Sequence, residues 1–178
     1  MKPRPEDTQA WVASVVRSGL GTEDEVRAQV VEAVRSDHPG LDADPVASRW
    51  IAEAMAAWRA DAESWPDPTD HERLQQAFGI LGEKGVVVLQ GCADHWVARD
   101  VATAQAPTGI AWFTPTDVWH AVDEGMLEVN LWHGTTANAA PGDKLLDDAI
   151  AAFAAVGLEA HFDEGRIEVA AYWQCRPR

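Results

Sequence analysis

The sequence has little of what secreted and membrane proteins need. It contains only two cysteines in 178 residues, Cys92 and Cys175. Without a secretory signal, we expect these to be free thiols rather than a disulfide. The first seven residues are polar, and no apolar run approaches the roughly 18 residues of a membrane span. These absences predict a cytoplasmic protein with no membrane partner.

Basic residues are also scarce. The chain has 14 Lys and Arg residues against 29 Asp and Glu residues, a formal net charge of −15 at pH 7. Such a chain repels phosphate backbones, and no local cluster of bases offsets this, so nucleic-acid binding is disfavoured. A glycine-rich phosphate loop is missing too, because Gly19-Leu-Gly21 lacks a third glycine and follows a helical pattern. The acidity favours solubility or a basic protein partner.

Tryptophan, in contrast, is abundant. Each tryptophan buries a large area and usually needs a partner for its indole N–H, so a high density is typical of an aromatic core or of a binding surface. Positions on predicted helix faces and strands favour the core. The nine residues are Trp11, Trp50, Trp58, Trp65, Trp96, Trp112, Trp119, Trp132 and Trp173.

Helical periodicity fills the first third of the chain. Apolar residues recur there at intervals of three and four, as on one face of an amphipathic helix. Asp44-Pro45 has the pattern of a helix cap followed by a proline in the first turn. Residues 1–65 are therefore predicted to form a three-helix N-terminal part, which Trp65-Pro66-Asp67-Pro68 separates from residues 66–178. The three helical patterns cover residues 5–18, 22–38 and 44–64.

Strand patterns occur only in residues 66–178. The uninterrupted apolar run Val86–Gln90 is typical of a strand covered on both faces. Three further helices are predicted, one before the first strand and two between later strands, while residues 100–106 have no clear pattern. We therefore predict an α+β (or α/β) fold, with a C-terminal mixed sheet of about five strands and packed helices. The strand patterns cover residues 86–90, 109–113, 126–132, 158–162 and 166–172, and the helical ones residues 69–84, 114–124 and 143–156.

The first predicted strand runs directly into Cys92, Asp94 and His95, which are candidate catalytic residues. The chemistry of α/β proteins usually lies where a strand passes into a loop. A cysteine nucleophile needs a base to take its proton, and that base needs an acid to orient it. These three residues lie within four positions, whereas catalytic partners normally converge from distant segments; Asp117 is a further candidate. A structural loop with a small buried cysteine is therefore favoured.

The histidines give little support for a metal site. Cys92 and His95 have the two-residue gap of a metal-ligand pair, and His133 is one residue that could join them. Closed zinc sites usually contain two close pairs, and the sequence has no second pair. A metal centre is therefore disfavoured, and no cofactor is predicted. His38 and His71 lie beside a turn and a helix start, so we expect them on the surface.

A Trp-Pro and a Thr-Asp pair precede a helix with Arg-Leu and Ala-Phe pairs and then a strand. The residues are Trp65-Pro66, Thr69-Asp70, Arg73-Leu74, Ala77-Phe78, Leu81 and Gly85-Val-Val87. In this pattern, and in scattered positions over most of its length, the chain resembles a bacterial family known only as a domain of unknown function. The resemblance implies no reaction, ligand or catalytic residue. Residues 91–96 differ from the polar segment typical of that family.

These patterns favour a non-enzymatic binding or accessory protein of the cytoplasm, with an acidic, Trp-bearing surface that meets a basic protein partner. The alternative is a small enzyme with a site at the end of strand 86–90, in which Cys92 and His95 act together and Asp117 and His133 lie nearby. A Cys92 thiol exposed in a pocket within reach of a histidine would favour the enzyme. A thiol buried among apolar side chains would favour the binding protein.

Overall fold

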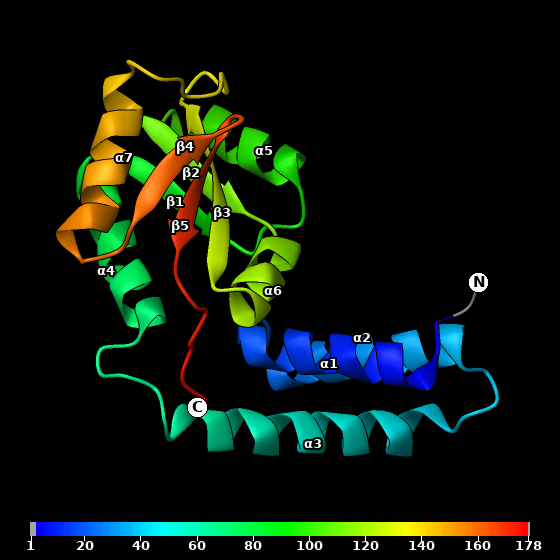
Figure 1. Cartoon of the computed structure of the whole chain (residues 1–178). Coiled ribbons are helices and arrows are strands. Elements are labelled where there is room, and N and C mark those ends of the chain that lie inside the picture. Colours follow the sequence, from blue (N-terminus) through cyan, green and yellow to red (C-terminus); the bar gives the residue numbers. More distant parts are fainter. Residues whose placement is uncertain (1–2, 178) are drawn as a thin grey trace. The chain divides into compact units, whose positions relative to one another are not determined.

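The computed structural model describes residues 3–177, which form two compact units (Figure 1). One unit contains the residues up to Pro66 and those from Cys175 onward, and the other contains Asp67–Gln174; we call them the helical unit and the sheet unit. The chain therefore passes between the units twice. Seven helices and one mixed sheet of five strands confirm the predicted α+β class.

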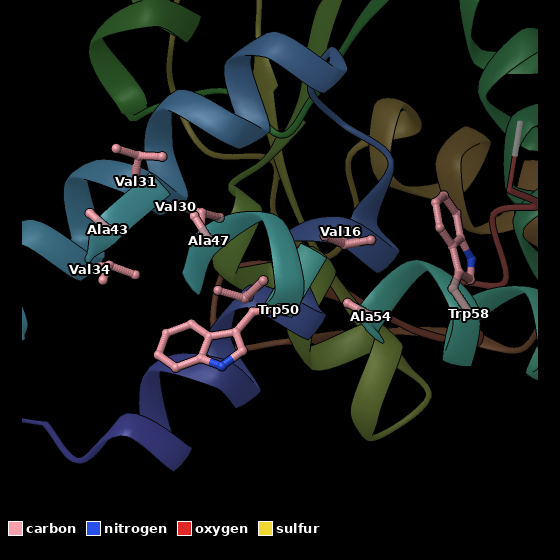
Figure 2. Packing of buried hydrophobic residues seen from close by; sticks show 10 residues of the cluster. Val16, Val30, Val31, Val34, Ala43, Ala47, Trp50, Ala54 and Trp58 are labelled. Carbon is pink, nitrogen blue, oxygen red and sulfur yellow. The ribbon is translucent and has the colours of Figure 1, made fainter. Parts of the chain in front are cut away.

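The helical unit consists of α1 (Pro5–Ser18), α2 (Glu23–Asp37) and α3 (Ala43–Ala62). Figure 2 shows its core, in which valines of α1 and α2 face alanines and tryptophans of α3. The helix α3 begins one residue before the predicted cap, with Asp42 as N-cap. Pro45 is tolerated there because the N–H groups of the first turn have no partner within the helix.

Cys175 and Arg176 return to the helical unit and contact it. The indole N–H of Trp58 donates a hydrogen bond to the carbonyl oxygen of Cys175 at 2.8 Å, and Arg176 donates to the carbonyl of Pro66 at 3.1 Å. Gly19 ends α1 at a φ of +61°, and a Cβ at this position would lie only 3.1 Å from the Cys175 sulfur. Glycine at the end of α1 therefore provides both the turn and the space for the C-terminal segment.

The sheet unit contains the remaining elements. Its strands are arranged in the order β1-β2-β3-β5-β4; β1 and β2 are parallel, and the other neighbouring strands are antiparallel. The elements are α4 (Asp70–Glu83), β1 (Val86–Gln90), α5 (His95–Gln105), β2 (Gly109–Phe113), α6 (Pro115–Asp123), β3 (Met126–His133), α7 (Lys144–Ala155), β4 (Ala160–Asp163) and β5 (Arg166–Ala170).

Helices cover both faces of the sheet, with α4 and α7 on one face and α5 on the other (Figure 1). On the first face, the ring of Phe113 lies 5.7 Å from that of Phe78 in α4 and 5.9 Å from that of Trp173. On the second face, α5 packs through Ala98 and Ala102. The core of the sheet unit is thus aromatic on both faces, because the alanines of α5 cover Trp112 and Trp132, whose rings lie 4.9 Å apart.

Two expectations from the sequence need correction. Val86–Gln90 is an edge strand; only Val86 is fully buried, and the next three residues are half-buried. The strand buried throughout is β2. In addition, α5 spans part of a segment that had no clear pattern. Its buried residues are alanines, which give a weak periodic signal because their side chains are so small.

Candidate functional site

The loop after β1 is organised by the start of α5. Asp94 is the N-cap of this helix, and its Oδ1 accepts hydrogen bonds from the backbone N–H groups of Trp96 at 2.8 Å and Val97 at 3.2 Å. The His95 ring stacks beside that of Trp96 at 4.6 Å, and the guanidinium of Arg99 lies 5.3 Å from the Trp96 ring centre. Asp94 therefore has a structural role, and His95 packs on an aromatic ring.

Cys92 lies half-buried against the apolar cluster beneath α5. Its thiol is 3.6 Å from the carbonyl oxygen of Asp94, which is its hydrogen-bond acceptor in the described part of the chain. Burial raises the pKa of this thiol, and the carboxylates of Asp94 and Asp117 raise it further. A catalytic cysteine needs the opposite surroundings, because the thiolate is the nucleophile. The geometry therefore favours a structural cysteine.

Asp117 and His133, the other candidates, have partners of their own. The Oδ2 of Asp117 accepts hydrogen bonds from the backbone N–H and the hydroxyl of Thr114, which caps α6. His133 lies 2.9 Å from Asp143 and opposite Gly109 at the start of β2. The backbone of Cys92, by contrast, bonds to Phe113 at the other end of β2, so roughly 13 Å of strand separates them.

Metal ligands are therefore not assembled around Cys92. Within residues 3–177, no group of three or more His, Cys, Asp and Glu side chains is placed to hold a metal ion. Cys92 lies beside Phe113 at one end of β2, and His133 lies beside Gly109 at the opposite end.

The raised pKa of Cys92 has a testable consequence. In a Cys175→Ser variant, Cys92 should react with iodoacetamide more slowly than glutathione does at about pH 8, because less of it is thiolate. The rate should keep rising at pH values above the ordinary thiol pKa of about 8.5, where the rate of an unshifted thiol levels off. Mass spectrometry of the alkylated protein and of alkylated glutathione over time measures the two rates. Faster alkylation than glutathione would show an activated thiol and would favour the enzyme.

Two histidines expected on the surface are instead partly buried. The ring of His71 lies edge-on to that of Trp173 at 4.6 Å, and its burial lowers its pKa. His38 lies 2.8 Å from the hydroxyl of Thr8 and packs edge-on against Trp50. The sequence does not reveal these contacts because the aromatic partners come from other elements.

The lowered pKa of His71 should make the sheet unit sensitive to acid. Below the ordinary histidine pKa of about 6.5, the unfolded chain binds a proton that the folded histidine resists. The stability that His71 contributes is therefore fully present above about pH 6.5. It is lost as the pH falls through the pKa that His71 has in the folded protein. Glu72 opposes the shift without cancelling it. Melting temperatures of the wild type and a His71→Gln variant, compared between about pH 8 and pH 5, should diverge; parallel curves would contradict this.

On the α5 side of the sheet, one row of side chains is apolar on β1 and β2 and polar on the other three strands. One row in register across all five strands consists of Leu89, Trp112, Asn130, Arg166 and Asp163. Its first two members are apolar and belong to the cluster that packs against α5. The other three, on β3, β5 and β4, are polar and lie outside that cluster.

We call the polar part of this sheet face the polar half-face. Its residues are Glu128, Asn130, His161, Asp163, Arg166 and Glu168.

Two carboxylates lie side by side on the polar half-face. Glu128 of β3 is directly opposite Glu168 of β5, and their side chains are 22% and 27% exposed. Arg166 forms an ion pair with Glu128, and the His161 Nε2 lies 3.3 Å from Glu168. Like charges directly opposite on neighbouring strands destabilise a sheet, so this pair needs neutralising neighbours. Sequence analysis missed it because β3 and β5 are distant in the chain.

The tryptophans lie mainly in the interior, as their positions indicate. Five are buried, three are half-buried, and Trp96 is exposed, with 58% of its surface accessible. Val97 beside it is also exposed. Trp96 lies in the first turn of α5, after the loop at the carboxyl end of β1, and Glu128 lies toward the carboxyl end of β2. The exposed indole and the carboxylate pair therefore lie at the same end of the sheet unit.

Comparison with known proteins identifies a family but no function. A family model described as a domain of unknown function, DUF6891, matches residues 3–177. No curated protein and no solved structure matches the chain. Between residues 3 and 177, no helix is both long and apolar enough to cross a membrane. Because the family model covers nearly the whole sequence, the chain belongs to the DUF6891 family of domains of unknown function.

Proposed function

We propose that this protein is a non-enzymatic binding protein whose polar half-face engages a basic protein partner. The main support for this proposal is that Glu128 and Glu168 are directly opposite each other on neighbouring strands and only partly exposed. Like charges in that position cost stability. Departures from the rules of stable sheets are expected where a surface serves function. Arg166 already pairs with Glu128, and a lysine or arginine side chain of a partner would add a second positive charge beside the two carboxylates.

The distribution of charge supports a basic partner. The sheet unit has 17 Asp and Glu residues against five Lys and Arg residues, a formal charge of −12. The total of −15 leaves −3 for the rest of the chain. A potential of one sign speeds the association of an oppositely charged protein and repels nucleic acid.

Trp96 supplies the aromatic contact that such an interface needs. A few large side chains, often tryptophans, provide most of the binding energy of an interface. Trp96 is already exposed, and its ring lies 4.6 Å from the His95 ring and 5.3 Å from the Arg99 guanidinium. An exposed aromatic held in this way loses little conformational freedom on binding.

The cytoplasm is the compartment in which we propose this binding takes place. Cys92, one of the two cysteines, is a free thiol. Free thiols persist in a reducing compartment, whereas an oxidising one favours disulfides.

Affinity capture tests the proposal. The immobilised protein should retain basic proteins from a native lysate, and these should elute as the salt concentration rises. A Trp96→Ala variant and a Glu128→Gln/Glu168→Gln variant should retain less of the same proteins, whereas Tyr172→Ala, another exposed aromatic, should retain the wild-type amount. Equal capture by all variants, or capture of acidic proteins only, would contradict the proposal.

A further inference from the structure

The edge strand β1 has none of the features that usually prevent an edge strand from pairing with a strand of another chain. The edge strand β4 is short and carries Asp163 and His161. The other edge strand, β1, pairs with β2 in unbroken register over Val86–Gln90 and contains no charge, proline, glycine or bulge. Natural proteins usually protect such an edge with one of these devices. An edge strand without them is suited to pairing with another strand.

The helix beside this edge leaves open space. The side-chain amides of Gln75 in α4 and Gln90 in β1 exchange two hydrogen bonds of 2.9 and 2.8 Å, so this side of α4 runs along β1. Gly79 and Gly82 lie four and seven residues after Gln75, on the same helix face. A Cβ added to either glycine would meet no heavy atom within 4 Å.

These two glycines have no explanation within one chain. Glycine weakens a helix because it loses more conformational freedom on folding than other residues. Where no neighbour crowds the position, alanine would fit and would strengthen the helix. A close approach by a second backbone is the remaining reason for glycine at such a position.

We propose that β1 pairs with β1 of a second copy of this chain, antiparallel across a two-fold axis. A two-fold contact uses the same surface on both copies, and a uniform five-residue strand centred on Val88 can pair with itself. The charge supports a second copy as the occupant. The chain has a net charge of −15, yet Gly85–Ala93 contains no charged residue. The β1 strands of two acidic copies thus meet where neither strand is charged.

The contact joins two five-stranded sheets into one continuous sheet, with the α4 helices of the two copies side by side over their glycines. The strands β3, β5 and β4, which carry the polar half-face, lie toward the opposite edge of each sheet. Dimer formation is therefore independent of the partner binding proposed above.

Sedimentation of the full chain tests the dimer. The wild type should sediment at twice the chain mass of 19.4 kDa. Gly79→Arg places a long charged side chain beside β1 and should halve the sedimenting mass, and Gly82→Arg should do the same. Ala151→Arg, which adds the same side chain at an exposed position of α7, is the matched control and should remain dimeric. Circular dichroism checks that each variant is folded, which we expect because both positions face open space.

The proposal fails if the wild type sediments at one chain mass over its whole soluble concentration range. It also fails if either folded arginine variant keeps the dimer mass, because the contact would then use another surface. A higher oligomer would contradict a closed two-fold contact as well. Two positions on the same helix face keep the test decisive if one arginine variant does not fold.

Discussion

Replacing Phe113 by alanine should lower the free energy of unfolding of the sheet unit by about 3–5 kcal/mol. This side chain is fully buried in β2, the strand that is buried throughout. It contacts Phe78 of α4 and the ring of Trp173. Removal of the ring leaves a cavity among aromatic side chains, which are too rigid to close it. Urea unfolding followed by circular dichroism measures the loss.

Trp96→Ala is the matched control for this prediction, since it removes a larger aromatic side chain from an exposed position. Its effect on stability should stay within about 0.5 kcal/mol, as is usual for surface substitutions. Equal losses for Phe113→Ala and Trp96→Ala would contradict the assignment of core and surface. So would a loss below about 1 kcal/mol for Phe113→Ala.

Neutralising Glu128 and Glu168 of the polar half-face should weaken binding with little effect on stability. In a Glu128→Gln/Glu168→Gln variant, each removed charge should weaken binding of an oligo-arginine peptide by about tenfold, or about 1.4 kcal/mol. The melting temperature should change little, because the loss of the exposed ion pair with Arg166 is offset by relief of the like-charge repulsion. Isothermal titration calorimetry at low salt measures the affinities.

A control variant with the same change of net charge is available on the other side of the sheet. Glu83 and Asp147 are exposed and belong to α4 and α7. Glu83→Gln/Asp147→Asn should weaken peptide binding only by the small amount that a change of overall charge produces. Equal weakening by both double variants would mean that net charge alone attracts the peptide, and the polar half-face would then have no special role.

Local patterns were enough to predict most of the fold. The capping residues Thr22, Thr69 and Thr114 each accept the hydrogen bond of a capping box, and each precedes a helix. Strands β1, β2 and β3 begin where their apolar patterns begin. These features succeed because each depends on residues within a few positions of one another. The helix α5 was missed because alanines provide its buried face.

The candidate sites were harder to predict, because they depend on which strands become neighbours. The sequence places Cys92, Asp94 and His95 together but does not reveal that Asp94 caps α5 or that burial raises the pKa of Cys92. The Glu128–Glu168 pair requires β5 to lie between β3 and β4. Alternation in β3 marks two faces but does not show which face is left uncovered by α5. Local sequence patterns contain no signal for the order of the strands in the sheet.

The most direct test of the binding proposal is a map of where a basic peptide binds. The backbone amide signals of the ¹⁵N-labelled protein should be followed by nuclear magnetic resonance during titration with an oligo-arginine peptide. We expect the largest shifts at Glu128, Asn130 and Glu168, with smaller shifts at Trp96, and reversal on addition of salt. Shifts confined to the helical unit or to α4 and α7, or no shifts at all, would contradict the account.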